Sequence, residues 1–451
     1  MTKNNKLTLA AAAVAATMAC NSTALAQSAD KLIEKLVDKG VLTVKEANDL
    51  REEADKDFTT AYSSKNGMPE WVTALKFNGD FRGRYESFNY ENGATPSRAR
   101  FRYRTRFGFT ADLKDSLEVG LRLGSGDLDG GVPSGGIDPI SNNQTLQNNA
   151  SKKGIFLDLA YGKWTPLKSG PWAGTLTAGK MENPFVFPST MMFDKDYTPE
   201  GAAVELAWHN NPKDPTKNMH TVKFSGAGFV LDELGADSND PFVAGAQLRW
   251  DATWNKHFSS SLGASMWGIT AEQNLGNAAV PNINSGNTRG TNGVPVNNFT
   301  PIQADASLTY TMDKFPLYPL PFPITGFGEY IHNPGASDRN NGYALGLTLG
   351  KSGKKGTWDI GYQYRHLEGD AWYEEFTESD FGANYLTAAT GGSAGYRAGT
   401  NVKGHVIRAQ YSPYDSFTFG ITYWLTDLID ASPAGSKSGA GRLQVDAVLK
   451  F

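Results

Sequence analysis

The last nine residues of the chain are Leu443-Gln444-Val445-Asp446-Ala447-Val448-Leu449-Lys450-Phe451. Apolar residues occupy every odd position, and the even positions between them are polar except for Val448. A period of two predicts a β-strand with two different faces. Strands of a membrane barrel alternate in this way, apolar toward lipid and polar toward the lumen. An edge strand of a soluble sandwich has the same pattern, so this segment alone leaves both folds open.

The opposite end of the chain predicts export. Lys3 and Lys6 precede an apolar, alanine-rich run that ends at Cys20, and the small residues Ala24 and Ala26 offer a cleavage site before Gln27. We therefore expect residues 1–26 to be a signal peptide. Cys20 is the only cysteine and follows a poor lipobox, so lipidation is the less favoured alternative. After cleavage, no disulfide or thiolate metal site is expected, and no cofactor is indicated.

The composition excludes other classes of protein. The chain has 451 residues, 49 of them glycine, and 12% are aromatic. No apolar run of about 18 residues follows the expected signal peptide, which excludes a helical membrane protein. The mean hydropathy of −0.42 still allows a β-barrel, because only every second residue of its strands must be apolar. Removing two lysines with the signal peptide changes the formal charge from −4 to −6, and nothing suggests nucleic acid.

Residues 27–67 carry the only helical pattern. Apolar residues recur at helical spacing before Gly40, and the pair Thr43 and Glu46 matches a capping box that opens a second helix. We expect a small helical hairpin and a polar linker in the periplasm. The two helices either bury their thin apolar stripe against each other or use it for self-association or docking.

From residue 68 to residue 451 the pattern changes to strands separated by turn residues. We expect an all-β transmembrane barrel of about sixteen antiparallel strands, an even number as in single-chain bacterial barrels. The predicted strands are 74–88, 98–112, 116–125, 153–164, 173–181, 201–209, 220–231, 241–253, 257–269, 301–312, 322–332, 341–350, 356–366, 402–411, 416–426 and 441–451.

The connections between these strands support a membrane barrel independently. Every second connection is short, as at 113–115 and 254–256, and those between are mostly long, as at 181–200 and 367–400. Short periplasmic turns that alternate with long outer loops are typical of an up-and-down membrane barrel. The proline-rich connection 313–321 is an exception on the short side.

The placement of arginines in the first two predicted strands indicates a function. Arginines alternate with other residues in the first two strands, at Arg82, Arg84, Arg98, Arg100, Arg102, Arg104 and Arg106. On the lipid face each would cost roughly 2–4 kcal/mol near mid-membrane, so they are expected to face the lumen. The six expected to line the pore are Arg82, Arg84, Arg100, Arg102, Arg104 and Arg106. Unpaired charges need a wet lumen, and a wet barrel of this strand number is wide enough to be a channel. The alternative is a basic strand on the surface of a soluble protein.

The long connection 181–200 is a candidate partner for these arginines. It combines aromatic residues with four acids, Glu182, Asp194, Asp196 and Glu200. Folded into the lumen, this loop would narrow the pore and set acids opposite the arginines. The resulting field would select solutes by charge and size. The alternative is an ordinary outer loop.

Several motifs resemble the bacterial putative-porin family of outer-membrane channels. They are Met68-Pro69-Glu70-Trp71 leading into Gly79-Asp80-Phe81-Arg82-Gly83-Arg84-Tyr85-Glu86, then Gly179-Lys180-Met181-Glu182-Asn183-Pro184-Phe185, and Asp194-Lys195-Asp196-Tyr197-Thr198-Pro199-Glu200-Gly201. The resemblance implies a channel for small hydrophilic solutes or ions in outer-membrane lipid, in a homotrimer. Phe451 resembles the terminal aromatic residue that the barrel assembly machinery reads during insertion.

Enzymatic functions are disfavoured by the sequence. The six histidines show no metal-binding spacing, and no GxSxG or phosphate-binding loop is present. The remaining alternative to a channel is a structural outer-membrane barrel that serves as a scaffold or as an adhesin. Its Asn- and Gly-rich stretch near 276–300 would then be the adhesive loop. A conductance measurement distinguishes the two, because a scaffold would be silent.

Overall fold

The computed structural model describes residues 69–91, 96–127, 140–210, 219–235, 237–275, 286–382, 399–430 and 437–451. The expected signal peptide (1–26) and helical hairpin (27–67) lie outside the described residues. The chain divides into two units. Of the smaller unit, the described part is 69–76 and 111–114, joined by an ion pair of 2.7 Å between Lys76 Nζ and Asp112 Oδ2. The larger unit comprises residues 77–110 and 115–451.

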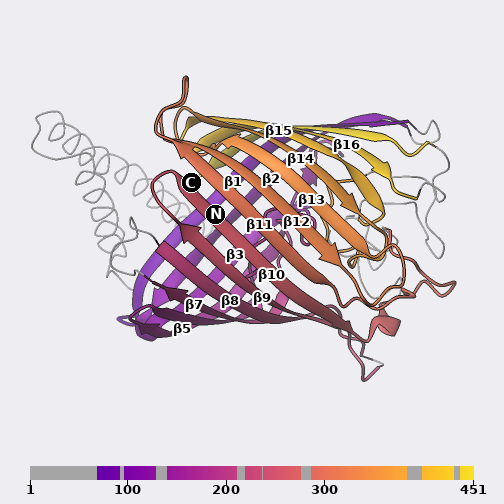
Figure 1. The fold of residues 1–451 in the computed structure, drawn as a ribbon, viewed down its shortest axis with the longest axis horizontal. Coiled ribbons are helices and arrows are strands. Elements are labelled where there is room, and N and C mark those ends of the chain that lie inside the picture. The colour runs from indigo at the N-terminus through magenta and orange to yellow at the C-terminus, as the bar shows by residue number, and fades with distance from the viewer. Residues whose placement is uncertain are drawn as a thin grey trace, which may run out of the picture. The chain divides into compact units, whose positions relative to one another are not determined.

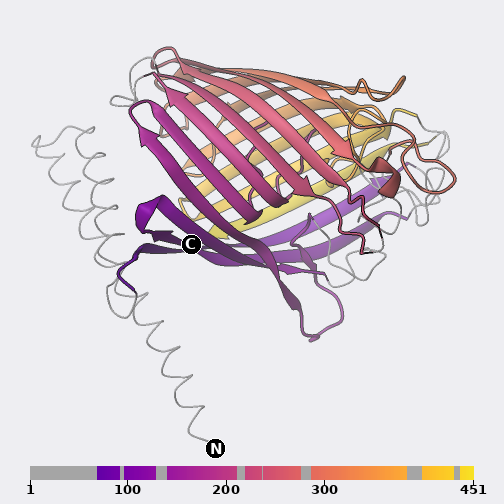
Figure 2. The same cartoon turned by 90° about the horizontal axis from the view of Figure 1, so that it is seen from below.

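The strands of the described chain follow one another around a single sheet (Figures 1 and 2). Their bounds are β1 Val72–Tyr90, β2 Arg98–Leu113, β3 Leu117–Gly126, β4 Gln144–Thr145, β5 Gly154–Ser169, β6 Trp172–Lys180, β7 Glu200–His209, β8 Met219–Val230, β9 Phe242–Thr253, β10 Phe258–Thr270, β11 Ile302–Met312, β12 Phe322–His332, β13 Asn341–Gly350, β14 Thr357–Leu367, β15 Val402–Tyr414, β16 Phe417–Leu428 and β17 Ala440–Lys450. Two short 3-10 helices span Lys114–Ser116 and Glu272–Asn274.

The last strand closes the sheet against the first. β17 pairs antiparallel with β1 from Asp80↔Lys450 to Tyr90↔Ala440, and Phe451 exchanges two backbone hydrogen bonds with Gly79. Apart from the two-residue β4, the sixteen strands of the described chain form a closed antiparallel barrel, which confirms the predicted barrel and its strand number. Closure leaves no edge strand with unpaired backbone groups, which a membrane would not tolerate.

Two predicted strands are too short. β5 continues to Ser169 and β15 to Tyr414, past the prolines Pro166 and Pro413 that suggested turns. In both strands the register shifts at the proline, between Trp164 and Leu167 and between Tyr411 and Tyr414. Proline is compatible with a strand at such a bulge, because no ladder hydrogen bond is needed from it there. β4 was not predicted; it pairs with β2 through Arg102↔Thr145 and Tyr103↔Gln144.

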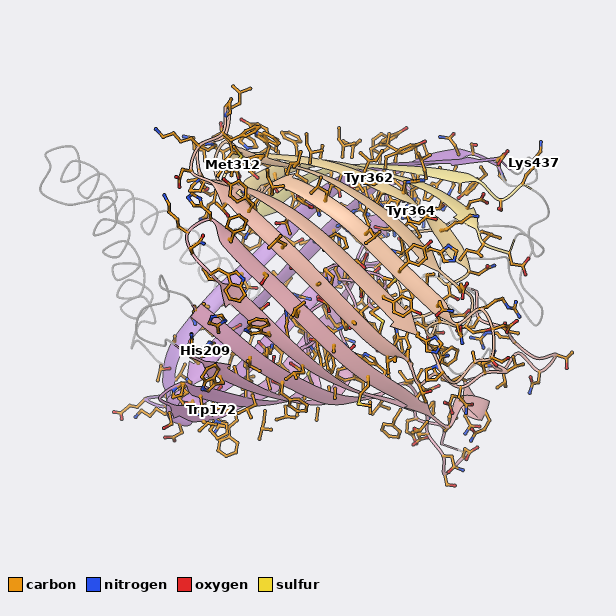
Figure 3. The ribbon with its side chains drawn as sticks, viewed as in Figure 1. Trp172, His209, Met312, Tyr362, Tyr364 and Lys437 are labelled. Carbon is orange, nitrogen blue, oxygen red and sulfur yellow. The ribbon has the colours of Figure 1, made fainter. Side chains whose placement is uncertain are left out.

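The outer face of the barrel is apolar. Exposed side chains include Phe101 on β2, Leu248 on β9 and Ile421 on β16, and they alternate with inward polar ones. Trp172, Tyr362 and Tyr364, labelled in Figure 3, lie on this face. Among the described residues, no helix is long and apolar enough to cross a membrane.

The best-buried apolar residues lie inside the barrel. Inward side chains of the strands, among them Phe229, Val243 and Trp267, pack with residues of two long connections, 181–199 and 368–382. We call these connections the first inward segment and the second inward segment. Trp372 of the second inward segment is fully buried, and its ring centroid lies 5.9 Å from that of Phe193 of the first. The two segments therefore support each other within the lumen.

Candidate functional site in the barrel lumen

We call the six predicted pore arginines of β1 and β2 the arginine column: Arg82, Arg84, Arg100, Arg102, Arg104 and Arg106. Five of them, all but Arg82, are paired with carboxylates of the barrel wall or the inward segments. Arg84 donates two hydrogen bonds, of 2.7 and 2.8 Å, to the carboxylate of Asp446 on β17. Arg104 and Arg106 share Asp80 of β1, at 2.9 and 2.7 Å. On β1 and β2 these side chains alternate with exposed residues such as Phe81 and Phe107, so they face the lumen.

Glu86 organises the end of the column nearer the outer loops. This carboxylate is fully buried and pairs with Arg100 at 2.5 Å, with Arg102 at 3.8 Å and with Arg442 of β17. Gln444 Nε2 also donates to it, at 2.9 Å. A buried carboxylate needs such partners, because an uncompensated charge is strongly destabilising away from water. These three arginines therefore share one carboxylate of their own wall.

The first inward segment crosses the lumen from one wall to another. Val186 exchanges two hydrogen bonds with Gln247 of β9, at 3.0 and 2.8 Å. Asp196 reaches the arginine column, where its carboxylate lies 3.2 Å from Arg104 and 3.5 Å from Arg106. The first inward segment therefore brings one acid to the arginines of β2.

The other acids of the first inward segment have different neighbours. Asp194 lies on the same cavity as Arg82 and Arg84 and accepts hydrogen bonds from Ser379 N and Oγ, at 3.0 and 3.2 Å. Glu182 pairs instead with Arg122 of β3, and Glu200, at the start of β7, pairs with Lys180 at 3.1 Å. Two of the four predicted acids therefore do not meet the arginine column, because they lie at the ends of the segment where it joins the wall.

The second inward segment supplies acids that the sequence analysis did not select. Asp380 lies 2.7 Å from Arg442 and 3.7 Å from Arg84, and Glu378 lies 2.8 Å from Arg365 of β14. The sequence signal was the same as for the first inward segment: aromatic residues and acids together in a long outer connection. Trp372, Tyr373, Phe376 and Phe381 carry it.

A fully buried ion pair holds the second inward segment in place. Arg289 Nη2 lies 2.6 Å from Glu374 Oε1, and both side chains have no exposed surface. Asn287 donates to the carbonyls of Gly369 and Trp372, at 2.7 and 2.8 Å. The two inward segments are joined as well, since Trp372 Nε1 donates to Met192 O at 2.8 Å. Residues 286–300 thus hold the second inward segment in place inside the barrel.

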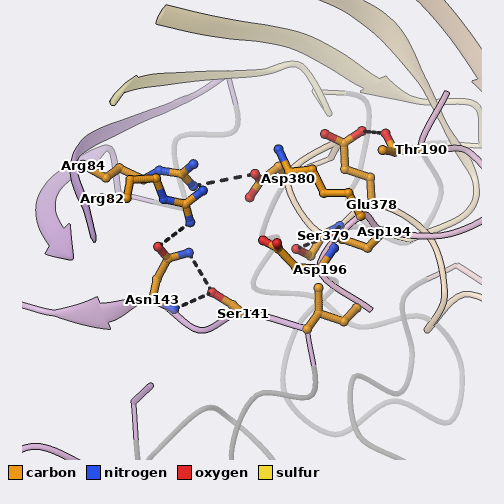
Figure 4. A pocket seen from close by; sticks show the side chains of 12 residues that line it. Arg82, Arg84, Ser141, Asn143, Thr190, Asp194, Asp196, Glu378, Ser379 and Asp380 are labelled. Carbon is orange, nitrogen blue, oxygen red and sulfur yellow. Dashed lines mark hydrogen bonds and ion pairs between the residues drawn. The ribbon is translucent and has the colours of Figure 1, made fainter. Parts of the chain in front are cut away.

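Opposite charges face each other across one small cavity (Figure 4). Arg82 and Arg84 form one wall, and Asp194, Asp196 and Asp380 form the other. The cavity measures about 20 Å³, which is room for roughly one water molecule. Besides these residues, Ile140, Ser141, Asn143, Thr190, Lys195, Glu378 and Ser379 line it. We call this arrangement the charged constriction.

The acids of the charged constriction differ in their protonation. Burial, together with the carboxylates of Asp196 and Asp380, raises the pKa of Asp194 to about 7. Burial alone would also raise the pKa of Asp196, but Arg104, Lys195 and Arg82 outweigh it and lower that pKa. Arg442 and Arg84 likewise lower the pKa of Asp380 against the effect of burial. Near neutral pH, Asp194 is therefore the acid of this set whose charge changes.

Comparison with known proteins places this geometry in context. A family model described as "Putative porin" matches residues 92–288 and 325–451. Among solved structures, the chain is similar to the outer-membrane channel DcaP of Acinetobacter baumannii, with 10% identity and a TM-score of 0.42 over 84% of this chain and 97% of that one. It is also similar to OprB of Pseudomonas putida, with 12% identity and a TM-score of 0.46 over 85% and 99% of the two chains. No curated protein sequence matches the chain.

Proposed function

The chain belongs to the putative porin family, and we propose that it is an outer-membrane porin whose charged constriction selects small hydrophilic solutes and ions. It is a channel protein rather than an enzyme. More specifically, we propose that the arginine column and the opposing acids of both inward segments control the passive diffusion of these solutes and ions. In keeping with the sequence analysis, we also propose a homotrimer, with residues 27–67 in the periplasm.

The observation that carries the proposal is that groups of opposite charge line two sides of the constriction. Guanidinium groups of β1 and β2 lie on one side, and Asp196 and Asp380 on the other, on segments that leave the wall. Charges fixed in this way produce a transverse field, which orients dipolar solutes and favours one sign of ion. Segments that only filled the interior of the barrel would not need these charged contacts, because apolar packing alone would suffice.

A second function is favoured by the tight packing of the lumen. The aromatic cluster of the inward segments and the water-sized cavity would also suit a barrel that does not conduct and serves as a scaffold. Purified full-length protein in planar bilayers tests the choice. We expect stepwise conductance in potassium chloride; a protein that inserts but remains silent would support the scaffold.

Neutralising Asp196 is expected to shift ion preference toward anions. A unit charge at about 4 Å is worth roughly 1 kcal/mol in water, so Asp196→Asn should change the permeability ratio by about fivefold. Reversal potentials in asymmetric potassium chloride measure the shift. Glu200→Gln is the matched control, because it removes the same charge from the same connection but beside Lys180. Equal shifts in both variants would show that the acids act only through net charge.

The cation preference of the channel is expected to rise with pH around neutrality. Asp194 has a raised pKa of about 7, so it is mostly neutral at about pH 6 and mostly charged at about pH 8. Asp196 and Asp380, whose pKa values are lowered, stay ionised throughout this interval. Raising the pH therefore adds one negative charge to the constriction. Reversal potentials across this interval measure the change, and a wild-type response that persists in Asp194→Asn would assign it to another group.

A further inference from the structure

We infer that Arg82 is an anion-binding site in the charged constriction, and that it takes a single water-sized anion such as chloride. The inference deepens the proposed function and depends on it for the effect on conduction, although binding itself can be measured separately. It distinguishes one arginine of the column from the other five, which the sequence pattern treats alike.

Arg82 differs from its neighbours in its partners. Among the described residues it forms no ion pair, and its one hydrogen bond, of 2.7 Å, goes from Nη2 to the neutral side-chain oxygen of Asn143. Its Nε atom is buried and has no hydrogen-bond partner. Only 5% of the residue is exposed. A buried guanidinium with an unused donor and no carboxylate within ion-pair distance favours an anion beside it.

The remaining column arginines are already occupied. Arg84 pairs with both Asp446 and Asp380. Arg104 and Arg106 each pair with both Asp80 and Asp196. Arg100 and Arg102 converge on Glu86. An anion at any of these five would have to compete with a carboxylate that is part of the chain.

The acids opposite Arg82 also have their own partners, which limits their repulsion of an anion. Asp196 and Asp380 pair with arginines, and Asp194 is held by the backbone N–H groups of Asp196 and Ser379. Lys195, an exposed residue on the same cavity, forms no ion pair within the described part of the chain. Arg82 and Lys195 are thus the two cations lining this cavity that lack a carboxylate partner.

The surroundings of Arg82 are ordered and small. Asn143 Nδ2 donates to Ser141 Oγ at 2.9 Å, which turns the amide oxygen toward Arg82, and Arg102 Nη2 donates to the Asn143 carbonyl at 3.2 Å. The cavity of about 20 Å³ accepts one guest the size of a water molecule. That size suits a halide ion and excludes a whole organic acid, unless the exposed Lys195 moves aside.

Bromide soaked into crystals of the full-length protein tests binding directly, because its anomalous scattering locates it. We expect a peak within hydrogen-bond distance of the Arg82 guanidinium in the wild type, lost in Arg82→Gln and retained in Arg100→Gln. Arg100→Gln is matched in charge and removes a neighbouring column arginine that pairs with Glu86. The absence of a wild-type peak, a peak that survives in Arg82→Gln, or equal peaks at the paired arginines would overturn the inference.

Conduction supplies a second, independent measurement. In bilayers, Arg82→Gln should lower chloride permeability relative to potassium by more than Arg100→Gln does, and the difference should vanish when gluconate replaces chloride. If Arg82→Gln fails to assemble, Arg82→Lys retains the charge without the planar fork and should lower bromide occupancy. Unchanged occupancy in Arg82→Lys would count against the site. A silent wild-type barrel would refute the proposed function, while the bromide result would still decide the inference.

Discussion

Glu374→Gln is expected to release the second inward segment and to increase the conductance of each channel. The substitution leaves Arg289 buried without its counter-charge, and removing one partner of a buried ion pair costs about 3–5 kcal/mol. The barrel itself should persist, because its ladder hydrogen bonds do not involve this pair. The segment would then lose one of its anchors to residues 286–300, and the aromatic contact between Trp372 and Phe193 would loosen.

Three measurements check this expectation. Single-channel conductance should rise and become noisier, limited proteolysis should cut within 368–382, and heat-modifiable migration on gels should be retained. Glu368→Gln is the control, since this partly exposed acid on the same connection accepts from Asn341 N at 2.8 Å and lies outside the buried pair.

A double replacement, Arg289→Met with Glu374→Leu, tests whether the effect of Glu374→Gln comes from the unpaired buried charge of Arg289. Apolar residues of similar volume often replace a buried ion pair without loss of stability. We therefore expect the double variant to return toward the wild-type conductance. If Glu374→Gln conducts like the wild type, the second inward segment is not held by this pair.

Phe451→Asp is expected to reduce the amount of assembled barrel by on the order of tenfold. This loss is larger than the factor of about five that a destabilisation of 1 kcal/mol would produce. Phe451 is 72% exposed at the seam, where its backbone pairs with Gly79. Near the membrane interface a charged side chain costs only about 0–1 kcal/mol, so a loss of this size would not reflect folded stability. It would point instead to recognition of the terminal aromatic residue during insertion.

Two control variants make this prediction specific. Phe451→Tyr keeps an aromatic terminus and should assemble normally. Phe258→Asp places the same charge at another exposed aromatic residue, at the start of β10 beside Tyr310, and should reduce assembly only slightly. Quantifying heat-modifiable protein in outer-membrane fractions measures all three. Comparable losses in Phe258→Asp and Phe451→Asp would assign the effect to the rim charge alone.

The sequence by itself was sufficient for the wall of this protein. Alternation with a period of two is a local property, so it predicts both the strand bounds and the face of each residue. It also predicts that Arg82 and Arg104 face the lumen, because a lipid-facing arginine is costly. Its errors at β5 and β15 arose because a proline suggests a turn, whereas a bulge lets the strand continue.

Only the tertiary structure decided which charges meet. Asp196 joins Arg104 across 92 positions of sequence, and Ser379 joins Asp194 across 185. No local period encodes such contacts, because they depend on how two long connections pack together inside the closed sheet. Arg82 has the same sequence context as Arg84, yet Arg84 finds Asp446 and Asp380 while Arg82 finds only an amide. The alternation of residues determined the wall, and the packing of the segments within it determined the constriction.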